Sequence, residues 1–116
     1  MERVEKSQEE HDSLVRAMAE YFKNNGHRNV KASIAGYGQP GQIGDHIPDV
    51  TSVDAIGKNV VEAETCDTIT SAHTADQWRT FDRCGAKFHV IVPAAGEEAA
   101  KRRANELGVT PKIWHV

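Results

Sequence analysis

Apolar residues recur every three or four positions along residues 7–25, and charged residues occupy most of the positions between them. This spacing places the apolar side chains on one stripe and predicts an amphipathic helix. Ser7 followed by Glu10 has the form of an N-terminal capping box, and Gly26 stands where a C-terminal cap belongs. The stripe consists of Leu14, Val15, Met18, Tyr21 and Phe22.

Three short segments with a β-compatible pattern follow the predicted helix. They cover residues 28–34, residues 47–54 and residues 59–65. The second and third segments are separated only by a turn at residues 57–59, so we expect them to pair as an antiparallel hairpin. The first and second are separated by residues 36–44, which hold four glycines and a proline. Such a segment does not sustain a helix or a central strand, and we expect an exposed, mobile loop.

The second half of the chain alternates between helical and strand patterns. Thr74 and Gln77 have the form of a second capping box, and Gly85 and Gly108 stand where helices end. The predicted order of elements over the whole chain is αβββαβαβ, in one domain of residues 1–116. This order favours an α/β or α+β fold, with a mixed central sheet flanked by helices. The predicted elements are a helix at 74–84, a strand at 88–92, a helix at 97–107 and a strand at 112–116.

Composition narrows the class of protein. The 116 residues are 39% hydrophobic and 27% charged, which excludes a disordered tail and a collagen-like repeat. No apolar run approaches the roughly 20 residues that span a bilayer, and none follows the N-terminus as a signal peptide would, so we expect a cytoplasmic protein without a membrane partner. The net charge of −3 argues against coating nucleic acid by bulk electrostatics. It is compatible with an enzyme that gathers carboxylates at a metal site.

The candidate chemistry lies on the predicted hairpin. Glu62 and Glu64 are two positions apart on one strand, so their side chains point to the same face. Asp49, after Pro48 on the preceding strand, is expected opposite or diagonal to them. Three neighbouring carboxylates repel one another unless a cation lies between them, and oxygen ligands of this kind suit Mg²⁺ or Mn²⁺.

These residues resemble the PD-(D/E)xK nuclease superfamily, whose restriction-endonuclease-like core has the order αβββαβ. The resemblance rests on Pro48-Asp49, on Glu62-Ala63-Glu64 and on the element order from Ser7 to Val92, with the last helix and strand as an extension. It implies a metal-dependent nuclease that hydrolyses phosphodiester bonds of nucleic acid, most simply DNA. Asp49 and Glu62 would hold Mg²⁺ or Mn²⁺, and Glu64 stands where the superfamily usually has a lysine.

The resemblance also suggests further site residues. Glu10 on the first helix is a candidate metal ligand, and Gln77 on the second helix is a candidate catalytic residue. Glu64 would orient or deprotonate the attacking water or serve as an extra metal ligand, and Lys58 is a substitute for the missing lysine. The candidate phosphate-binding residues are Lys31, Lys58 and Arg79.

Plainer interpretations stand beside these. Glu62 and Glu64, taken alone, fit the solvated face of a strand. Glu10 and Gln77 are each explained by the capping box to which they belong. His11 and His46 are placed to assist as acid or base, although a surface or hydrogen-bonded histidine is the commoner state. The basic run at residues 101–103 is offset by neighbouring glutamates and fits a solvated helix face.

Two other functions compete with the nuclease. The first is a catalytically inactive nuclease-fold protein that binds nucleic acid or serves as an assembly module, which the glutamate at the lysine position favours. The second is a small interaction protein with no nucleic-acid partner. Because a chain of this size has little surface for a duplex, the nuclease hypothesis also predicts a homodimer or dependence on a partner protein.

Overall fold

The computed structural model describes residues 5–116, so the first four residues of the predicted domain lie outside the described part. The observed order of elements is the predicted αβββαβαβ, with one short 3₁₀ helix, η1, added before the last helix. The elements are α1 (Glu5–Asn24), β1 (Arg28–Ala32), β2 (Val50–Val53), β3 (Lys58–Ala63), α2 (Ala72–Asp82), β4 (Lys87–Val92), η1 (Ala94–Gly96), α3 (Glu97–Leu107) and β5 (Lys112–His115).

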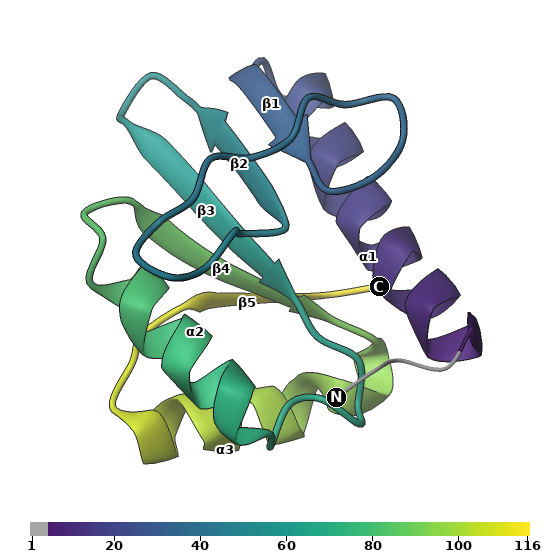
Figure 1. Cartoon of the computed structure of the whole chain (residues 1–116), viewed down its shortest axis with the longest axis vertical. Helices are drawn as coiled ribbons and strands as arrows, with labels where there is room; N and C mark the ends of the chain where they lie inside the picture. The colour runs from purple at the N-terminus through teal and green to yellow at the C-terminus, as the bar shows by residue number, and fades with distance from the viewer. Residues whose placement is uncertain (1–4) are drawn as a thin grey trace.

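The strands form one five-stranded mixed sheet in the order β1-β2-β3-β4-β5. β1, β2 and β3 are antiparallel neighbours, whereas β4 and β5 run parallel to β3. The predicted hairpin is confirmed, with Val50 opposite Val61 and Val53 opposite Lys58. One sheet of mixed direction with three α-helices makes this an α+β domain (Figure 1).

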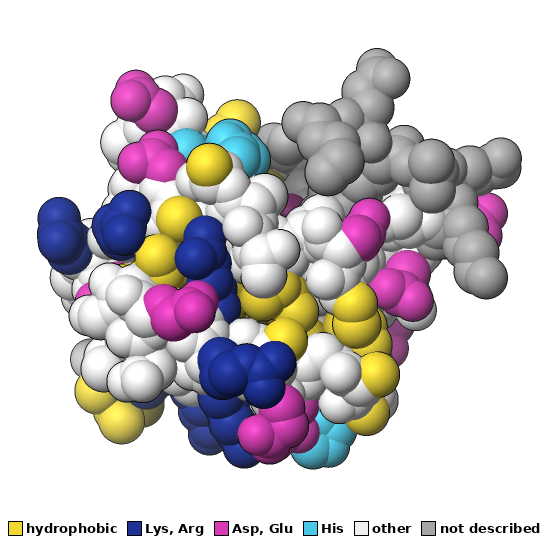
Figure 2. Space-filling model, turned by 90° about the horizontal axis from the view of Figure 1, so that it is seen from below, with side chains coloured by type: hydrophobic (Ala, Val, Ile, Leu, Met, Phe, Trp, Pro, Cys, Tyr) yellow, Lys and Arg dark blue, Asp and Glu magenta, His cyan; other side chains and the backbone are white. Residues whose placement is uncertain are grey.

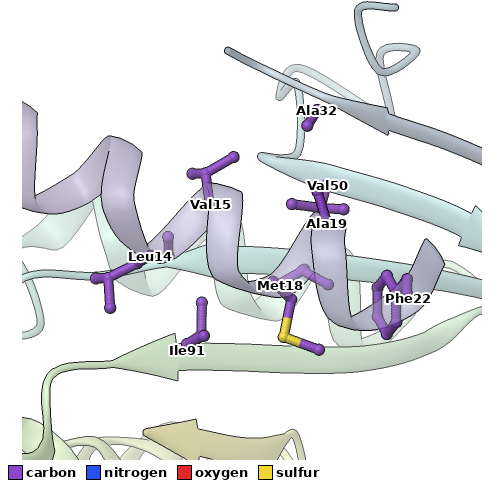
Figure 3. Close-up of a cluster of buried hydrophobic side chains, with 10 residues drawn as sticks. Leu14, Val15, Met18, Ala19, Phe22, Ala32, Val50 and Ile91 are labelled. Carbon is purple, nitrogen blue, oxygen red and sulfur yellow. The ribbon is translucent and has the colours of Figure 1, made fainter. Parts of the chain in front are cut away.

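Helix α1 covers one face of the sheet. Its buried stripe includes Leu14, Met18 and Phe22, which pack against Val50 of β2 and Ile91 of β4 (Figure 3). The predicted stripe is confirmed except at Tyr21, which is 43% exposed. Among residues 5–116, no helix is long and apolar enough to cross a membrane.

Helices α2 and α3 cover the opposite face (Figure 1). Trp78 and Phe81 of α2 are fully buried against Val60 of β3 and Val90 of β4. Because β-strand side chains alternate, Val60 faces α2 whereas Val61 faces α1. Glu62 and Glu64 share the parity of Val60 and therefore lie on the α2 side of the sheet.

The outer surface of α3 carries charges of both signs. Viewed from below, Lys and Arg side chains are interspersed with Asp and Glu (Figure 2). Lys101 Nζ lies 2.9 Å from Glu97 Oε1, and an Arg103 nitrogen lies 3.6 Å from Glu106 Oε1. Lys101 and Arg102 are exposed, as expected for a solvated helix face, whereas Arg103 is half-buried and donates to the carbonyl oxygen of Ser71 at 3.2 Å.

Both helix starts differ from the predicted capping boxes. Ser7 lies inside α1, which already includes Glu5, so Ser7 is not its N-cap. The N-cap of α2 is Ser71, whose side chain accepts a hydrogen bond of 3.0 Å from the backbone N–H of Thr74. The prediction was wrong because it followed the capping-box pattern of Thr74 and Gln77, whereas Ser71 caps α2 through its own hydroxyl without a Glu or Gln three residues later.

The segment between β1 and β2, residues 33–49, contains neither helix nor strand, which confirms the loop expected at 36–44 but shows that the strands predicted over 28–34 and 47–54 are shorter. It is not fully exposed, however. Pro40 is buried, Ile43 packs on the core beneath α2, and His46 is 8% exposed with its Nε2 2.7 Å from Asp76 Oδ2. The segment therefore crosses over β2 and β3 as a docked strap (Figure 1).

Candidate active site

The three candidate carboxylates line one cavity at the end of the hairpin. Asp49 immediately precedes β2, and its backbone N–H donates to the carbonyl of Val61 at 3.0 Å. Glu62 lies near the end of β3, and Glu64 follows its last residue. The cavity has a volume of about 290 Å³ and is lined by His11, Asp49, Glu62, Glu64, Thr68, Ser71, His73, Thr74 and Gln77. The hairpin geometry therefore brings together the residues that the strand pattern predicted.

Asp49 is held by the backbone and by α1. Its Oδ2 accepts a hydrogen bond of 2.9 Å from the N–H of Ala63 and lies 3.2 Å from Nε2 of His11. Its Oδ1 accepts a bond of 3.3 Å from the hydroxyl of Ser33. The other His11 nitrogen, Nδ1, lies 3.3 Å from Asp12 Oδ1, so the imidazole bridges two carboxylates. These contacts fix the position of Asp49 at the cavity wall.

Glu64 is 2% exposed and is anchored from the α2 side. Its Oε1 accepts a hydrogen bond of 2.6 Å from Thr68 Oγ1, and its Oε2 accepts one of 3.2 Å from the indole N–H of Trp78. Thr74 Oγ1 lies 3.4 Å from Oε1. Burying a carboxylate is costly unless donors compensate it, and Glu64 has such donors. The orientation of the Glu64 side chain is therefore set by α2 and by the turn that precedes α2.

Glu62 is also buried, at 3% exposure, on the α2 side of β3. Two buried glutamates and a half-buried aspartate around one cavity form a set of oxygen donors that suits Mg²⁺ or Mn²⁺ in type. Within residues 5–116, however, no three His, Cys, Asp or Glu side chains stand close enough together to hold a metal ion. The donor set fits such an ion chemically, and side-chain rotation is needed to gather it around one.

The remaining candidates divide between this cavity and other surfaces. Gln77 lines the cavity and is half-buried, in agreement with its predicted position near the carboxylates. Glu10 is exposed and does not line the cavity, whereas its neighbour His11 does. The signal for His11 was present in the sequence, since it precedes Leu14, Val15 and Met18 by the three, four and seven positions of one helical face.

The candidate phosphate-binding residues lie away from the carboxylates. Lys31 and Lys58 line a second, larger cavity of about 570 Å³ on the same side of the sheet. Arg79 is exposed on α2 and lines neither cavity. We call the cavity lined by Asp49, Glu62 and Glu64 the acidic cavity. Among the residues that the structure describes, no Lys or Arg lines it.

The hydroxyl groups around Glu64 were missed by sequence reasoning. Thr68, Ser71 and Thr74 all line the cavity, and they come from the turn after Glu64 and the first residues of α2. Their only sequence signal is the concentration of Ser and Thr in residues 65–74. Which of these hydroxyl groups faces a carboxylate depends on how α2 docks.

No family model, curated protein or solved structure matches this chain. The resemblance to the PD-(D/E)xK superfamily is therefore carried by the short motif and the element order alone.

Proposed function

We propose that this protein is a metal-dependent nuclease of the PD-(D/E)xK type, acting on phosphodiester bonds of DNA. One observation carries the proposal: Asp49, Glu62 and Glu64, separated by up to 15 positions in sequence, line a single cavity at the end of a β-hairpin. The topology supports it, because an antiparallel β1-β2-β3 unit with a parallel β4, between α1 and α2, resembles the superfamily core. On this proposal α3 and β5 are the extension.

The protein's own residues would divide the work as follows. Asp49 and Glu62 would hold Mg²⁺ or Mn²⁺, which supplies Lewis-acid activation of the phosphate and of a water molecule when bound. Asp49 is prepared for this by the Ala63 N–H, which fixes one carboxylate oxygen. Glu64, held by Thr68 and Trp78, would orient the attacking water or accept its proton.

The test combines metal binding with cleavage. Mg²⁺ and Mn²⁺ are titrated calorimetrically into the protein, and cleavage of labelled single-stranded, duplex and branched DNA is followed on gels. Glu62→Gln keeps the shape of the side chain and removes its charge, so we expect a cleavage rate lower by roughly 100-fold or more and weakened metal binding. Glu20→Gln on the exposed face of α1 is the matched control and should leave both unchanged.

Two results would contradict the proposal. The first is a wild-type protein that neither binds the metal ions nor cuts any of the substrates. The second is cleavage that survives both Glu62→Gln and Asp49→Ala at the wild-type rate, which would place the activity elsewhere.

A second candidate function is a nuclease-fold protein without catalysis, which binds nucleic acid or serves as an assembly module. The observation that favours it is the environment of Glu64, where hydrogen bonds from Thr68 and Trp78 anchor a glutamate in place of the usual lysine. Salt-dependent DNA binding without turnover at any metal concentration would favour this function over the first.

A homodimer or a partner protein belongs to both proposals, because a chain of 116 residues offers little surface to hold a duplex. Light scattering coupled to size-exclusion chromatography, with and without DNA, measures the oligomeric state directly.

A further inference from the structure

The second cavity is a groove on the hairpin, at the opposite end from the acidic cavity. We call it the hairpin groove. It has a volume of about 570 Å³ and lies between the first three strands, the strap and the turn before β4. Its lining residues are Asn29, Lys31, Gly41, Gln42, Ile43, Thr51, Ser52, Val53, Lys58, Asn59, Val60, Cys84, Gly85 and Ala86.

The hairpin groove exists because the helices cover this side of the sheet unevenly. The core beneath α2 and α3 is built mainly on β4, with Val60 of β3 at its margin. On the same side, the strap of residues 33–49 crosses over β2 and β3 in place of a helix (Figure 1). The strap is docked at Ile43 and His46 and forms one wall of the groove. The floor is the cross-strand pair of Thr51 and Val60.

An irregularity in β1 brings a second basic residue, Arg28, to the side of the sheet that carries the groove, although Arg28 is not among its lining residues. Lys31 is opposite Thr51, and Arg28 is opposite Val53, although three positions separate the two basic residues and only two separate their partners. The bulge responsible includes Asn29, whose φ is 52°. Without it, Arg28 and Lys31 would point to opposite faces; with it, both lie beside residues of the groove side.

The third basic residue comes from β3, where Lys58 is also opposite Val53. No Asp or Glu is among the described residues that line the groove. Asp54, in the adjoining turn, is engaged by Lys87 Nζ at 3.0 Å and by the backbone N–H groups of Ile56 and Gly57. The groove is thus a basic site in a chain whose net charge is −3.

The groove and the acidic cavity lie along one strand. Lys58 and Glu62 have the same parity on β3 and therefore point to the same side of the sheet. They are four positions apart on β3, which is about 13 Å at the usual rise of a strand. Measured along the axis of a duplex, where each strand advances about 3.4 Å per nucleotide, that distance is roughly four nucleotides.

We propose that the hairpin groove binds phosphate groups of the same nucleic-acid strand whose scissile phosphodiester lies at the acidic cavity. This inference rests on the proposed function and adds the path of the substrate. Lys31 and Lys58 would contact the phosphates, with the Thr51 hydroxyl and the Asn29 amide as further hydrogen-bond donors. An acidic peptide would fit the groove but be repelled by the acidic cavity, whereas a phosphodiester chain can bridge the two through a cation.

The lining also predicts how the strand is recognised. No aromatic side chain is among the described groove residues, so stacking on bases does not contribute. Lysine contacts to phosphates carry no sequence information, and we expect binding that is independent of sequence and strongly dependent on salt.

The first experiment measures binding without cleavage. Fluorescence anisotropy of a labelled 20-base-pair duplex is recorded in EDTA over a range of salt concentrations, with a single strand and an RNA of the same sequence as further arms. Lys31→Gln/Lys58→Gln should weaken binding and reduce the slope of log affinity against log salt by about 2 for the duplex. Lys101→Gln/Arg102→Gln on α3 removes the same net charge elsewhere and should leave the slope unchanged.

The second experiment measures the position of cleavage in Mg²⁺ or Mn²⁺. Substrates in which the cut lies one to eight nucleotides from an end should be cut poorly by the wild type when fewer than about four nucleotides remain on one side. The groove variant should lose this length dependence, and the α3 variant should keep it.

The outcomes separate this inference from the proposed function. A groove variant with wild-type affinity, salt slope and length dependence overturns the inference, even if the wild type cleaves DNA. A wild type that binds through the groove but never cleaves overturns the nuclease proposal and supports a binding site. A wild type that binds no nucleic acid at low salt overturns both.

Discussion

Two sets of buried polar side chains flank β3, and they differ in what surrounds them. On the α2 side, Glu62 and Glu64 line a cavity of about 290 Å³. On the α1 side, Asn59 and His89 are 2% and 6% exposed and bond to each other. His89 lines neither the acidic cavity nor the hairpin groove. The first set lines a cavity that a ligand can enter. The second, which we call the enclosed set, is centred on His89 and borders the hairpin groove through Asn59.

The enclosed set forms a chain of hydrogen bonds whose direction is fixed. The indole N–H of Trp114 only donates, so His89 Nδ1 accepts its bond of 3.0 Å. His89 Nε2 then carries the proton and donates to Asn59 Oδ1 at 2.9 Å, and Asn59 Nδ2 donates to Asp54 Oδ2 at 3.0 Å. Lys87 donates to the same Asp54 oxygen. Each member has one role, and the neutral form of His89 is required.

The comparison separates structural from functional polar burial. Polar groups that satisfy one another inside the protein contribute to stability and conformational specificity. Carboxylates that line a cavity add like charge at a surface where a cation can enter. We therefore expect substitutions in the set around His89 to lower stability and substitutions of the carboxylates around the acidic cavity to lower function.

The largest effect on folding is expected at His89. His89→Leu keeps the bulk of the side chain but leaves the Trp114 N–H and the Asn59 carbonyl oxygen without their partner. We expect the free energy of unfolding to fall by about 2–4 kcal/mol, because buried polar groups then lose their hydrogen bonds. Urea denaturation followed by circular dichroism measures the change.

His73→Leu is the matched control, since His73 is exposed on α2. It should change the free energy of unfolding by no more than about 0.5 kcal/mol. Equal destabilisation by the two substitutions would show that the hydrogen bonds of His89 do not contribute to the free energy of unfolding.

A smaller effect is expected from pH alone. Burial, together with the nearby positive charges of Lys112 and Lys87, lowers the pKa of His89 from 6.5 to about 4. Between these values the unfolded chain binds a proton that the folded protein does not, so stability decreases as the pH falls from 6.5 to 4. We expect His89 to contribute a loss on the order of 2 kcal/mol over this range.

Urea unfolding at several pH values tests this dependence. The wild type should lose more stability than His89→Leu between pH 6.5 and pH 4, because the variant lacks the titrating group. Parallel profiles for the two proteins would contradict the assignment of the effect to His89.

The architecture was predictable because local patterns decide it. Helical spacing defined the apolar face of α1, and Gly108, in the left-handed conformation with φ of 70°, ends α3 at the predicted residue. Strand parity placed Glu62 and Glu64 on one side, and the short turn set the hairpin register that brings Asp49 near them. These are relations between residues close in sequence or paired across one turn.

Features that depend on docking were not predictable. The contact between Trp78 and Glu64 needs the position of α2, and the bond between Trp114 and His89 joins two strands 25 positions apart. The bulge that aligns Arg28 with Lys31 has no marker beyond an asparagine, a residue that tolerates positive φ better than most.

The smallest expected change in stability distinguishes the two sets most directly, because Glu62→Gln should raise the free energy of unfolding whereas His89→Leu should lower it. Glu62→Gln removes one of three carboxylates around the acidic cavity and keeps the side-chain volume. Without divalent ions we expect the free energy of unfolding to rise by about 1 kcal/mol, because the repulsion of Glu62 by the neighbouring carboxylates of Asp49 and Glu64 is removed.

In saturating Mg²⁺ the wild type should become more stable than Glu62→Gln, because an ion that binds only the folded wild type stabilises it by mass action. Thermal unfolding in EDTA and in Mg²⁺ measures both states, and Glu20→Gln should follow the wild type in each. If Glu62→Gln is less stable than the wild type in EDTA as well, repulsion between the carboxylates does not dominate, and the acidic cavity belongs with the enclosed set.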